Sequence, residues 1–433
     1  MNDPVLGLIG FIAALGLIAL GMPVAIAMGI VGVMGYCWLN GWAGTAYILG
    51  SSPFESIFPY SLSVIPLFVM MGVFASHAGL SRSLFNAINS FIGHRRGGLA
   101  ITTVGACAFF GAICGSSLAT VATIGRVALP EMKRAGYDDS LSTATVAAGG
   151  TLGVLIPPSI LLVIYGLLTQ SSIGQLFVAA LIPGIVGAAL YALAIAVRVR
   201  LHPDLAPRSP RTDWPGRIRN LGQIWPVVLL FLTVIGGIYL GLFTPTEAAA
   251  VGAVGAFVLA LASGKLTRLA LRESVVETAA LTGMIFFILI GAALFNFFLE
   301  NTGLPQFLIG LIDATGLGPL GVMALILIFY LVLGCFMDSM SMILLTVPLL
   351  APVALQLDYD LIWFGIVVVT VAEIGLITPP VGMNLFVVQA ATNGVSSATV
   401  VRGILPFIFA DVVRLVLLLL FPLMALWLPG AML

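Results

Sequence analysis

Long apolar runs, separated by short polar segments, follow one another along the whole chain. A helix needs about 20 apolar residues to cross a bilayer. Runs close to that length predict ten crossings, at 5–21, 24–40, 62–78, 142–168, 175–198, 224–242, 246–263, 276–299, 361–390 and 404–428. The runs do not alternate with the two-residue period of a membrane β-barrel. The pattern therefore predicts an all-α polytopic membrane protein.

Two further apolar regions are interrupted near their centres. The region 98–133 is interrupted at "CGSS" (114–117), and the region 318–355 at "MDSM" (337–340). Each region has the length of either two crossings or one re-entrant hairpin. Small and polar residues suit a hairpin tip that lies inside the membrane against other protein groups. We therefore predict two re-entrant helical hairpins.

The composition agrees with this class and excludes others. Hydrophobic residues make up 61% of the chain and charged residues only 8%, whereas soluble domains carry about 25% charged residues. The four cysteines match no metal or disulfide spacing, and the basic residues form no patch beyond short loops. The sequence thus predicts a lipid bilayer around the protein, no nucleic-acid partner and no cofactor.

The positions of Lys and Arg predict the orientation, because these residues remain on the cytoplasmic side. If the N-terminus lies outside, the basic segments 82–96, 126–134, 198–219 and 265–272 all fall inside. The outside loops, predicted at 41–61, 169–174, 300–317 and 356–360, then contain no Lys or Arg. Ten crossings place the C-terminus on the outer side as well.

The two halves of the chain match at one fixed offset. Five pairs of prolines are 222 residues apart: Pro4 and Pro226, Pro23 and Pro245, Pro130 and Pro352, Pro157 and Pro379, and Pro158 and Pro380. This proline content gives roughly 0.6 such matches by chance. We predict a duplication with repeats at 1–222 and 223–433. Because each half has five crossings, the second repeat is inverted, which is typical of transporters.

Each half also contains a Pro-Pro pair inside an apolar run, in "GVLIPPSI" (153–160) and "GLITPPVG" (375–382). Proline has no N–H, so each pair interrupts helical hydrogen bonding. The carbonyls freed are those of Gly153 and Val154 in the first half and of Gly375 and Leu376 in the second. A cation, a buried hydroxyl or water could satisfy them. An ordinary kink explains one break, but two at matching positions favour a binding site.

The hairpin tips supply oxygen atoms near the same depth, from Ser116 and Ser117 in the first and from Asp338 and Ser339 in the second. Hydroxyl, carboxylate and carbonyl oxygens suit a hard cation, and sodium is the natural candidate. Glu373 is a second carboxylate within an apolar run, where ionisable groups are costly and usually functional. Either carboxylate could bind a cation, accept a proton or face a water-filled vestibule.

Two more charged features have alternative interpretations. Arg126 could reach the cytoplasmic surface or hold an anion. Asp411 and Arg414, three residues apart on the last crossing, are most simply an internal ion pair.

An intramembrane hydrolase with a serine nucleophile would need a nearby base, and none of the three histidines is predicted at that depth. A scaffold without transport activity would leave the duplicated breaks unexplained.

Three stretches resemble the most characteristic parts of one transporter family. "GAICGSSLATVATIGRVALPEMKRAGYD" (111–138), "AAGGTLGVLIPPSILLVIYG" (147–166) and "EIGLITPPVGMNLF" (373–386) are similar to the large membrane subunit of TRAP (tripartite ATP-independent periplasmic) transporters. The resemblance implies a bacterial inner-membrane importer of organic anions such as C4-dicarboxylates, sialic acid or other sugar acids. Both termini would then be periplasmic. The implied partners are a periplasmic binding protein and a small four-helix membrane subunit.

The resemblance also implies an elevator-type fold, in which both hairpins and both broken helices form a transport domain that moves against a scaffold of the remaining helices. It implies a first sodium site at Ser116, Ser117, Gly153 and Pro157, and a second at Asp338, Ser339, Gly375 and Thr378. We assign substrate contacts to Arg126, Ser159 and Glu373. The alternative function is an ion or anion exchanger of related architecture that needs no binding protein.

Overall fold

The computed structural model describes residues 3–392 and 394–431, and within these ranges the regular structure is helical. The first half contains α1 (Pro4–Ala19), α2 (Val24–Ile57), α3 (Val64–His77), α4 (Leu80–Ile92), α5 (Gly98–Cys114), α6 (Ser117–Arg134), α7 (Asp139–Leu155), α8 (Ile160–Thr169), α9 (Ile173–Leu201) and α10 (Trp214–Gly222). The second contains α11 (Trp225–Phe231), α12 (Gly237–Tyr239), α13 (Pro245–Ala262), α14 (Arg268–Thr302), α15 (Leu304–Thr315), α16 (Pro319–Gly334), α17 (Ser339–Gln356), α18 (Leu361–Ile377), α19 (Met383–Ala391), α20 (Ser397–Leu420) and α21 (Leu423–Ala431).

Several of these helices have the length and composition of membrane spans. Among the described residues, seven helices are long and apolar enough to cross a bilayer, or up to nine if each of two bent pairs is one span. One bent pair is α7 with α8, which meet at an angle of 42° at the first Pro-Pro break. The predicted class, an all-helical protein with multiple spans, is thus confirmed.

The two interrupted apolar regions each form a pair of helices, α5 with α6 and α16 with α17. Gly115 ends α5 in a left-handed conformation, with φ of 64°, which glycine adopts without steric cost. The side chain of Ser116 then caps α6, and that of Asp338 caps α17. Both predicted tips therefore consist of a short turn followed by a capped helix.

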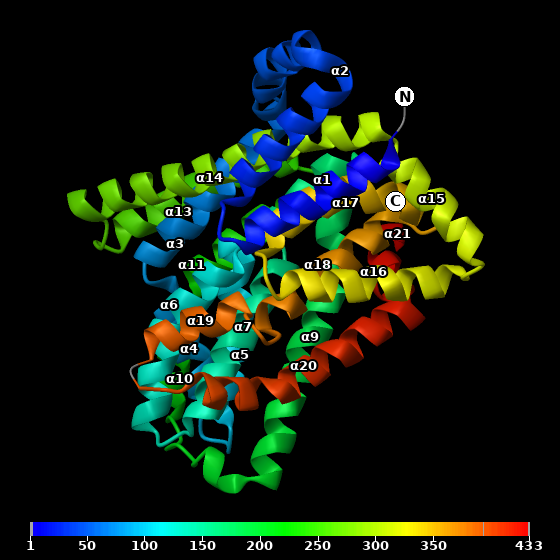
Figure 1. Cartoon of the computed structure of the whole chain (residues 1–433). Helices are drawn as coiled ribbons and strands as arrows, with labels where there is room; N and C mark the ends of the chain where they lie inside the picture. The colour runs from blue at the N-terminus through cyan, green and yellow to red at the C-terminus, as the bar shows by residue number, and fades with distance from the viewer. Residues whose placement is uncertain (1–2, 393, 432–433) are drawn as a thin grey trace.

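Both Pro-Pro pairs interrupt a helix as predicted. In the first half, α7 ends at Leu155 and α8 begins at Ile160. In the second half, α18 ends at Ile377 and α19 begins at Met383. The peptide bonds Pro157–Pro158 and Pro379–Pro380 are both cis. The broken helices α7 and α18 lie in the middle of the molecule in Figure 1.

The helices pack as two groups. In the first, α2 crosses α14 and α3 packs along α13. The α2–α14 crossing is close because Gly32 faces the backbone of Leu294 and Gly291 faces the backbone of Ala25. In the second group, α7 contacts α5, α6, α9 and α20, while α18 contacts α16, α17 and α9. The pairs α3–α5 and α14–α17 join the two groups.

Two predicted loops are wrong. Most of the predicted outside loop 300–317 is helical, because α14 runs to Thr302 and α15 covers Leu304–Thr315. We expected residues 41–61 to form an outside loop, but α2 continues to Ile57, and a short 3-10 helix follows at Tyr60–Ser63. Gly41, with φ of 73°, breaks the helical path without ending the helix. The exposed aromatic side chains of Trp42 and Tyr47 follow this break, and this part of α2 projects from the top of the molecule in Figure 1.

Candidate functional site

Each hairpin tip lies against the Pro-Pro break of its own half. A Cβ atom on Gly115 would lie 3.2 Å from the carbonyl oxygen of Pro158. In the second half, the N–H of Gly382 donates to the carbonyl of Cys335 at 3.4 Å. The structure therefore brings together the tip and the break that the sequence predicted to face each other.

Glycine pairs allow the hairpins to approach the broken helices this closely. Gly111 of α5 meets Gly153 of α7, and Gly334 of α16 meets Gly375 of α18, with backbone against backbone. A Cβ atom on Gly375 would lie 2.6 Å from the carbonyl carbon of Gly334. Side chains larger than hydrogen do not fit at these contacts.

We expect Gly375→Ala to destabilise the protein by about 1–3 kcal/mol, because the added methyl group would force the two backbones apart. Gly283→Ala is the matched control: it lies in α14 with open space around its Cβ position, and alanine favours helix by up to about 1 kcal/mol. Thermal unfolding of the two purified variants in detergent measures the difference. Equal melting temperatures would contradict the packing argument.

A buried polar cluster connects the two tips. Ser339 at the second tip donates a hydrogen bond to Oε1 of Glu373 at 2.9 Å. Asn384, in the first turn of α19, donates from Nδ2 to Oγ of Ser117 at 2.8 Å and to the carbonyl of Ala147 at 3.1 Å. The contact between Asn384 and Ser117 joins the second broken helix to the first hairpin.

Several oxygen atoms near these residues have no hydrogen-bond partner among the described residues. They are Oε2 of Glu373, Oδ1 of Asn384 and Oγ1 of Thr120. All three side chains are fully buried. Buried polar atoms are normally paired with protein, water or an ion, so these oxygens can accept a cation or ordered water.

Other predicted site residues form local hydrogen bonds with the backbone. Ser116 accepts from the N–H of Ala119 at 3.4 Å, and Ser159 from that of Leu162 at 3.3 Å. These two side chains cap α6 and α8. Asp338 caps α17 in the same way, accepting from the N–H of Ser341 at 3.0 Å. Thr378 donates from its hydroxyl to the carbonyl of Ile374 at 2.7 Å.

The two breaks differ in their free carbonyls. In α7, the N–H of Ile156 donates to the carbonyl of Leu152. The next helical donor, to the carbonyl of Gly153, would be residue 157, but this residue is proline and has no N–H. In α18, however, the carbonyl of Gly375 accepts from the N–H of Thr378 at 3.1 Å. The prediction that Gly375 lacks a backbone partner is therefore wrong, because one turn of tighter helix satisfies it.

The predicted substrate residues do not lie together. Arg126 is exposed and lines a cavity of about 560 Å³ between α6, α7 and α19, with Lys133 and Thr392. Ser159 and Glu373 are fully buried and do not line this cavity. The cavity nevertheless lies beside the first hairpin, and its charged lining consists of Arg126, Lys133 and the carboxylate Asp139.

A second buried cluster connects the halves through α9 and α20. Arg414 and Asp411 form the predicted ion pair, with 2.8 Å between Nη2 and Oδ1, and both side chains are almost fully buried. Tyr191 donates to Oδ2 of Asp411 at 2.6 Å, and its hydroxyl lies 3.0 Å from that of Thr151. The ion pair predicted from the sequence is confirmed.

Sequence reasoning missed Asn384, Tyr191 and Thr151. The sequence could have indicated Asn384, because it is a polar residue shortly after the Pro-Pro break in an apolar run, where polar residues are usually functional. Another existed for Thr151, which is 222 residues before Glu373 and so occupies the matching position. Tyr191 had no such signal.

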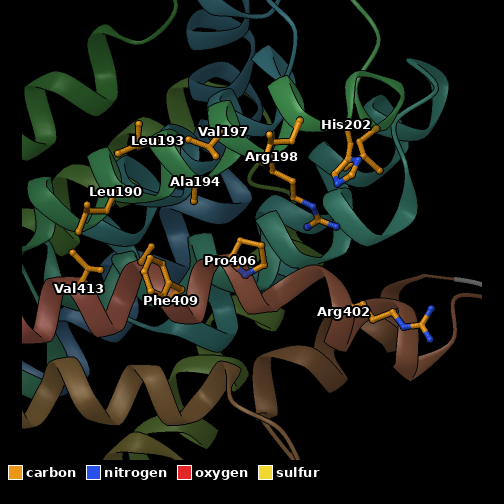
Figure 2. Close-up of a pocket in the computed structure, with 13 residues that line it drawn as sticks. Leu190, Leu193, Ala194, Val197, Arg198, His202, Arg402, Pro406, Phe409 and Val413 are labelled. Carbon is orange, nitrogen blue, oxygen red and sulfur yellow. The ribbon is translucent and has the colours of Figure 1, made fainter.

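A larger cavity, of about 720 Å³, lies between α9 and α20 and is lined mainly by apolar side chains (Figure 2). Arg198 stands near one end, where its guanidinium donates to the carbonyl of Gly403 and to Oγ of Ser140, each at 2.8 Å. The residues of the buried polar cluster do not line it. We therefore place the candidate site at the hairpin tips.

Comparisons with known proteins agree on one family. The family model described as "Tripartite ATP-independent periplasmic transporter, DctM component" matches residues 11–424. The C4-dicarboxylate TRAP transporter large permease protein DctM of Pseudomonas aeruginosa is 39% identical over 380 residues, which cover 87% of this chain and 88% of that protein. The ectoine/5-hydroxyectoine TRAP transporter large permease protein UehC of Ruegeria pomeroyi is 36% identical over 427 residues, covering 96% and 97%.

A solved transporter has a similar fold. The Alcanivorax borkumensis YdaH transporter superposes with a TM-score of 0.59, covering 88% of this chain and 89% of that one at 15% sequence identity. At this identity the likeness concerns the fold alone. The chain belongs to the TRAP transporter family, as a large membrane permease for organic solutes and not as an enzyme.

Proposed function

We propose that this permease imports an organic anion across the bacterial inner membrane and that sodium binding at the hairpin tips drives the import. The observation that carries the proposal is the buried Glu373 carboxylate, whose Oε2 has no partner among the described residues. Of the buried charged groups in this core, Asp411 is paired with Arg414. Glu373 is left without a charged partner, and a buried carboxylate needs either a proton or a bound cation; we propose the cation.

The mechanism follows from the position of this charge. Ser339 and Glu373 join the second tip to α18, while Ser117 and Asn384 join the first tip to α19. A sodium ion on these oxygens would neutralise the core and hold both tips closed on the substrate. An unneutralised core would cross the membrane at a high cost in free energy, so movement would be coupled to ion binding.

The helix pairing supports two inverted repeats, 1–222 and 223–433, in an elevator-type arrangement. Each half contains a hairpin, a broken helix and a Gly–Gly contact between them. We assign the hairpins and broken helices to the transport domain. We also assign α9 and α20 to it, although the sequence prediction placed them in the scaffold, because both pack on α7 and α18.

The partners and the orientation are proposed on the basis of the family. A periplasmic binding protein would deliver the substrate, and a small four-helix membrane subunit would brace the scaffold. The basic segments support a periplasmic position for both termini. Relatives named for a C4-dicarboxylate and for ectoine support a small organic substrate. In the cavity beside the first hairpin, the two cations Arg126 and Lys133 outnumber the one carboxylate, Asp139, and this balance supports an anion.

Sodium is expected to stabilise the purified protein specifically. At a concentration about 100 times the dissociation constant, a bound ion adds about 2.7 kcal/mol, so the melting temperature should rise in sodium chloride and not in potassium chloride. Ser339→Ala should weaken the sodium effect, since it removes the hydroxyl that positions Glu373. Ser56→Ala, whose hydroxyl bonds within α2, is the control. Identical responses to both salts would refute sodium binding.

The alternative, an exchanger that needs no binding protein, makes a different prediction. Proteoliposomes with the permease and its small subunit would then take up substrate at the same rate with or without the binding protein. Dependence on the binding protein would support the tripartite importer.

A further inference from the structure

A cavity of about 580 Å³ lies away from the hairpin tips, where α4, α5, α9 and the linker after α9 meet. Its polar lining is basic: Arg95 and Arg96 come from the α4–α5 turn, Arg200 from the end of α9, and Arg208 from the linker. His94 completes the polar lining, and Ile101, Ala196 and Val199 provide an apolar wall. Four arginines from three separate segments thus line one space, and all four are exposed.

No carboxylate is among the described residues that line this cavity. Asp204 and Asp213 lie in the same linker but do not line it. Elsewhere on the same surface an arginine is paired, as Arg134 is with Glu131 at 2.8 Å. Like charges repel, so a cluster without its own counter-charge is most stable with a bound anion.

Buried polar groups beside the cavity also lack partners. Nδ1 of His94 is buried without a hydrogen-bond partner among the described residues, as are Nε and Nη2 of Arg217. Arg217 is only 5% exposed, and its guanidinium stacks 5.0 Å from the ring centre of Trp214 and 5.7 Å from that of Phe91. Desolvation, and after it the charges of Arg211, Arg217 and Arg95, lower the pKa of His94.

We propose that this cavity binds a phosphate-bearing anion at the cytoplasmic face. Guanidinium groups match phosphate oxygens in geometry and charge, and four arginines line this cavity. The anion would tie the start of the first hairpin to α9 and the linker between the halves. Its source is either the headgroup of an anionic phospholipid or a free phosphorylated solute. The proposal does not depend on sodium coupling.

The test uses the purified full chain and two probes. Pyrophosphate, titrated against protein in a neutral detergent, reports a free anion; phosphatidylglycerol, added to phosphatidylcholine nanodiscs, reports a lipid headgroup. The variant Arg95→Gln/Arg208→Gln removes two charges from the cavity. The control Arg268→Gln/Arg272→Gln removes two charges from the exposed start of α14, on the same side of the membrane.

We expect at least one probe to raise the melting temperature with a saturable response. The cavity variant should weaken that response by about tenfold or more, whereas the control should change it by less than about twofold. Arg95→Lys/Arg208→Lys, which keeps the charge, should recover part of the binding. Absence of a response to both probes, or equal losses in the cavity variant and the control, would overturn the proposal.

Discussion

Glu373→Gln is expected to weaken sodium binding by about 100-fold, equivalent to about 2.8 kcal/mol. Glutamine keeps the shape of the side chain and an oxygen that can accept from Ser339, but it removes the buried negative charge. The cation then lacks its principal counter-charge in a region of low dielectric constant. Radioactive sodium binding to the purified protein measures the change, and ion-driven uptake in proteoliposomes with the partner proteins should fall with it.

The fold should survive this substitution, since a neutral side chain is easier to bury than an unpaired carboxylate. The melting temperature without sodium should be unchanged or higher, while its rise with sodium should be lost. Glu300→Gln, on the exposed end of α14, is the matched control and should bind sodium normally. Normal sodium binding by Glu373→Gln would exclude this carboxylate from the ion site.

Arg414→Met is expected to cost about 3–5 kcal/mol of stability, because it leaves the Asp411 carboxylate buried without its cation. The pair has 2.8 Å between its charged atoms, and both side chains are almost inaccessible to solvent. Arg402→Met, on the same helix but exposed, should change stability by less than about 0.5 kcal/mol. Thermal and denaturant unfolding in detergent compare the two variants.

A double variant separates the stability cost of an unpaired buried charge from the cost of losing the packing of the arginine side chain. Asp411→Leu/Arg414→Met removes both charges, so it should regain part of the stability that Arg414→Met loses. Tyr191 would keep its contact with Thr151, which lies 3.0 Å away. If the double variant is as unstable as the single one, the cost arises from lost packing and not from an unpaired charge.

Predictions based on local covalent chemistry agreed best with the structure. The Pro-Pro pairs break α7 and α18 because proline cannot donate a hydrogen bond. The hairpin tips lie where they were predicted, and the structure adds that Ser116 and Asp338 cap the helices that follow. The Gly375 carbonyl was a failure of the same reasoning. Pro379 has no N–H to donate to the Gly375 carbonyl, but the N–H of Thr378, three residues after Gly375, donates to it instead.

The sequence by itself determined the helical membrane class, the two interrupted hairpins, the two breaks and the Asp411–Arg414 pair, because apolar run length, proline and three-residue spacing act locally. Only the tertiary structure decided that Asn384 meets Ser117, that Ser339 meets Glu373 and that Tyr191 meets Asp411. These partners lie 267, 34 and 220 residues apart. Glu373, for example, lies in α18, which is buried on nearly all sides, so no polar face of this helix shows which neighbour the residue will meet.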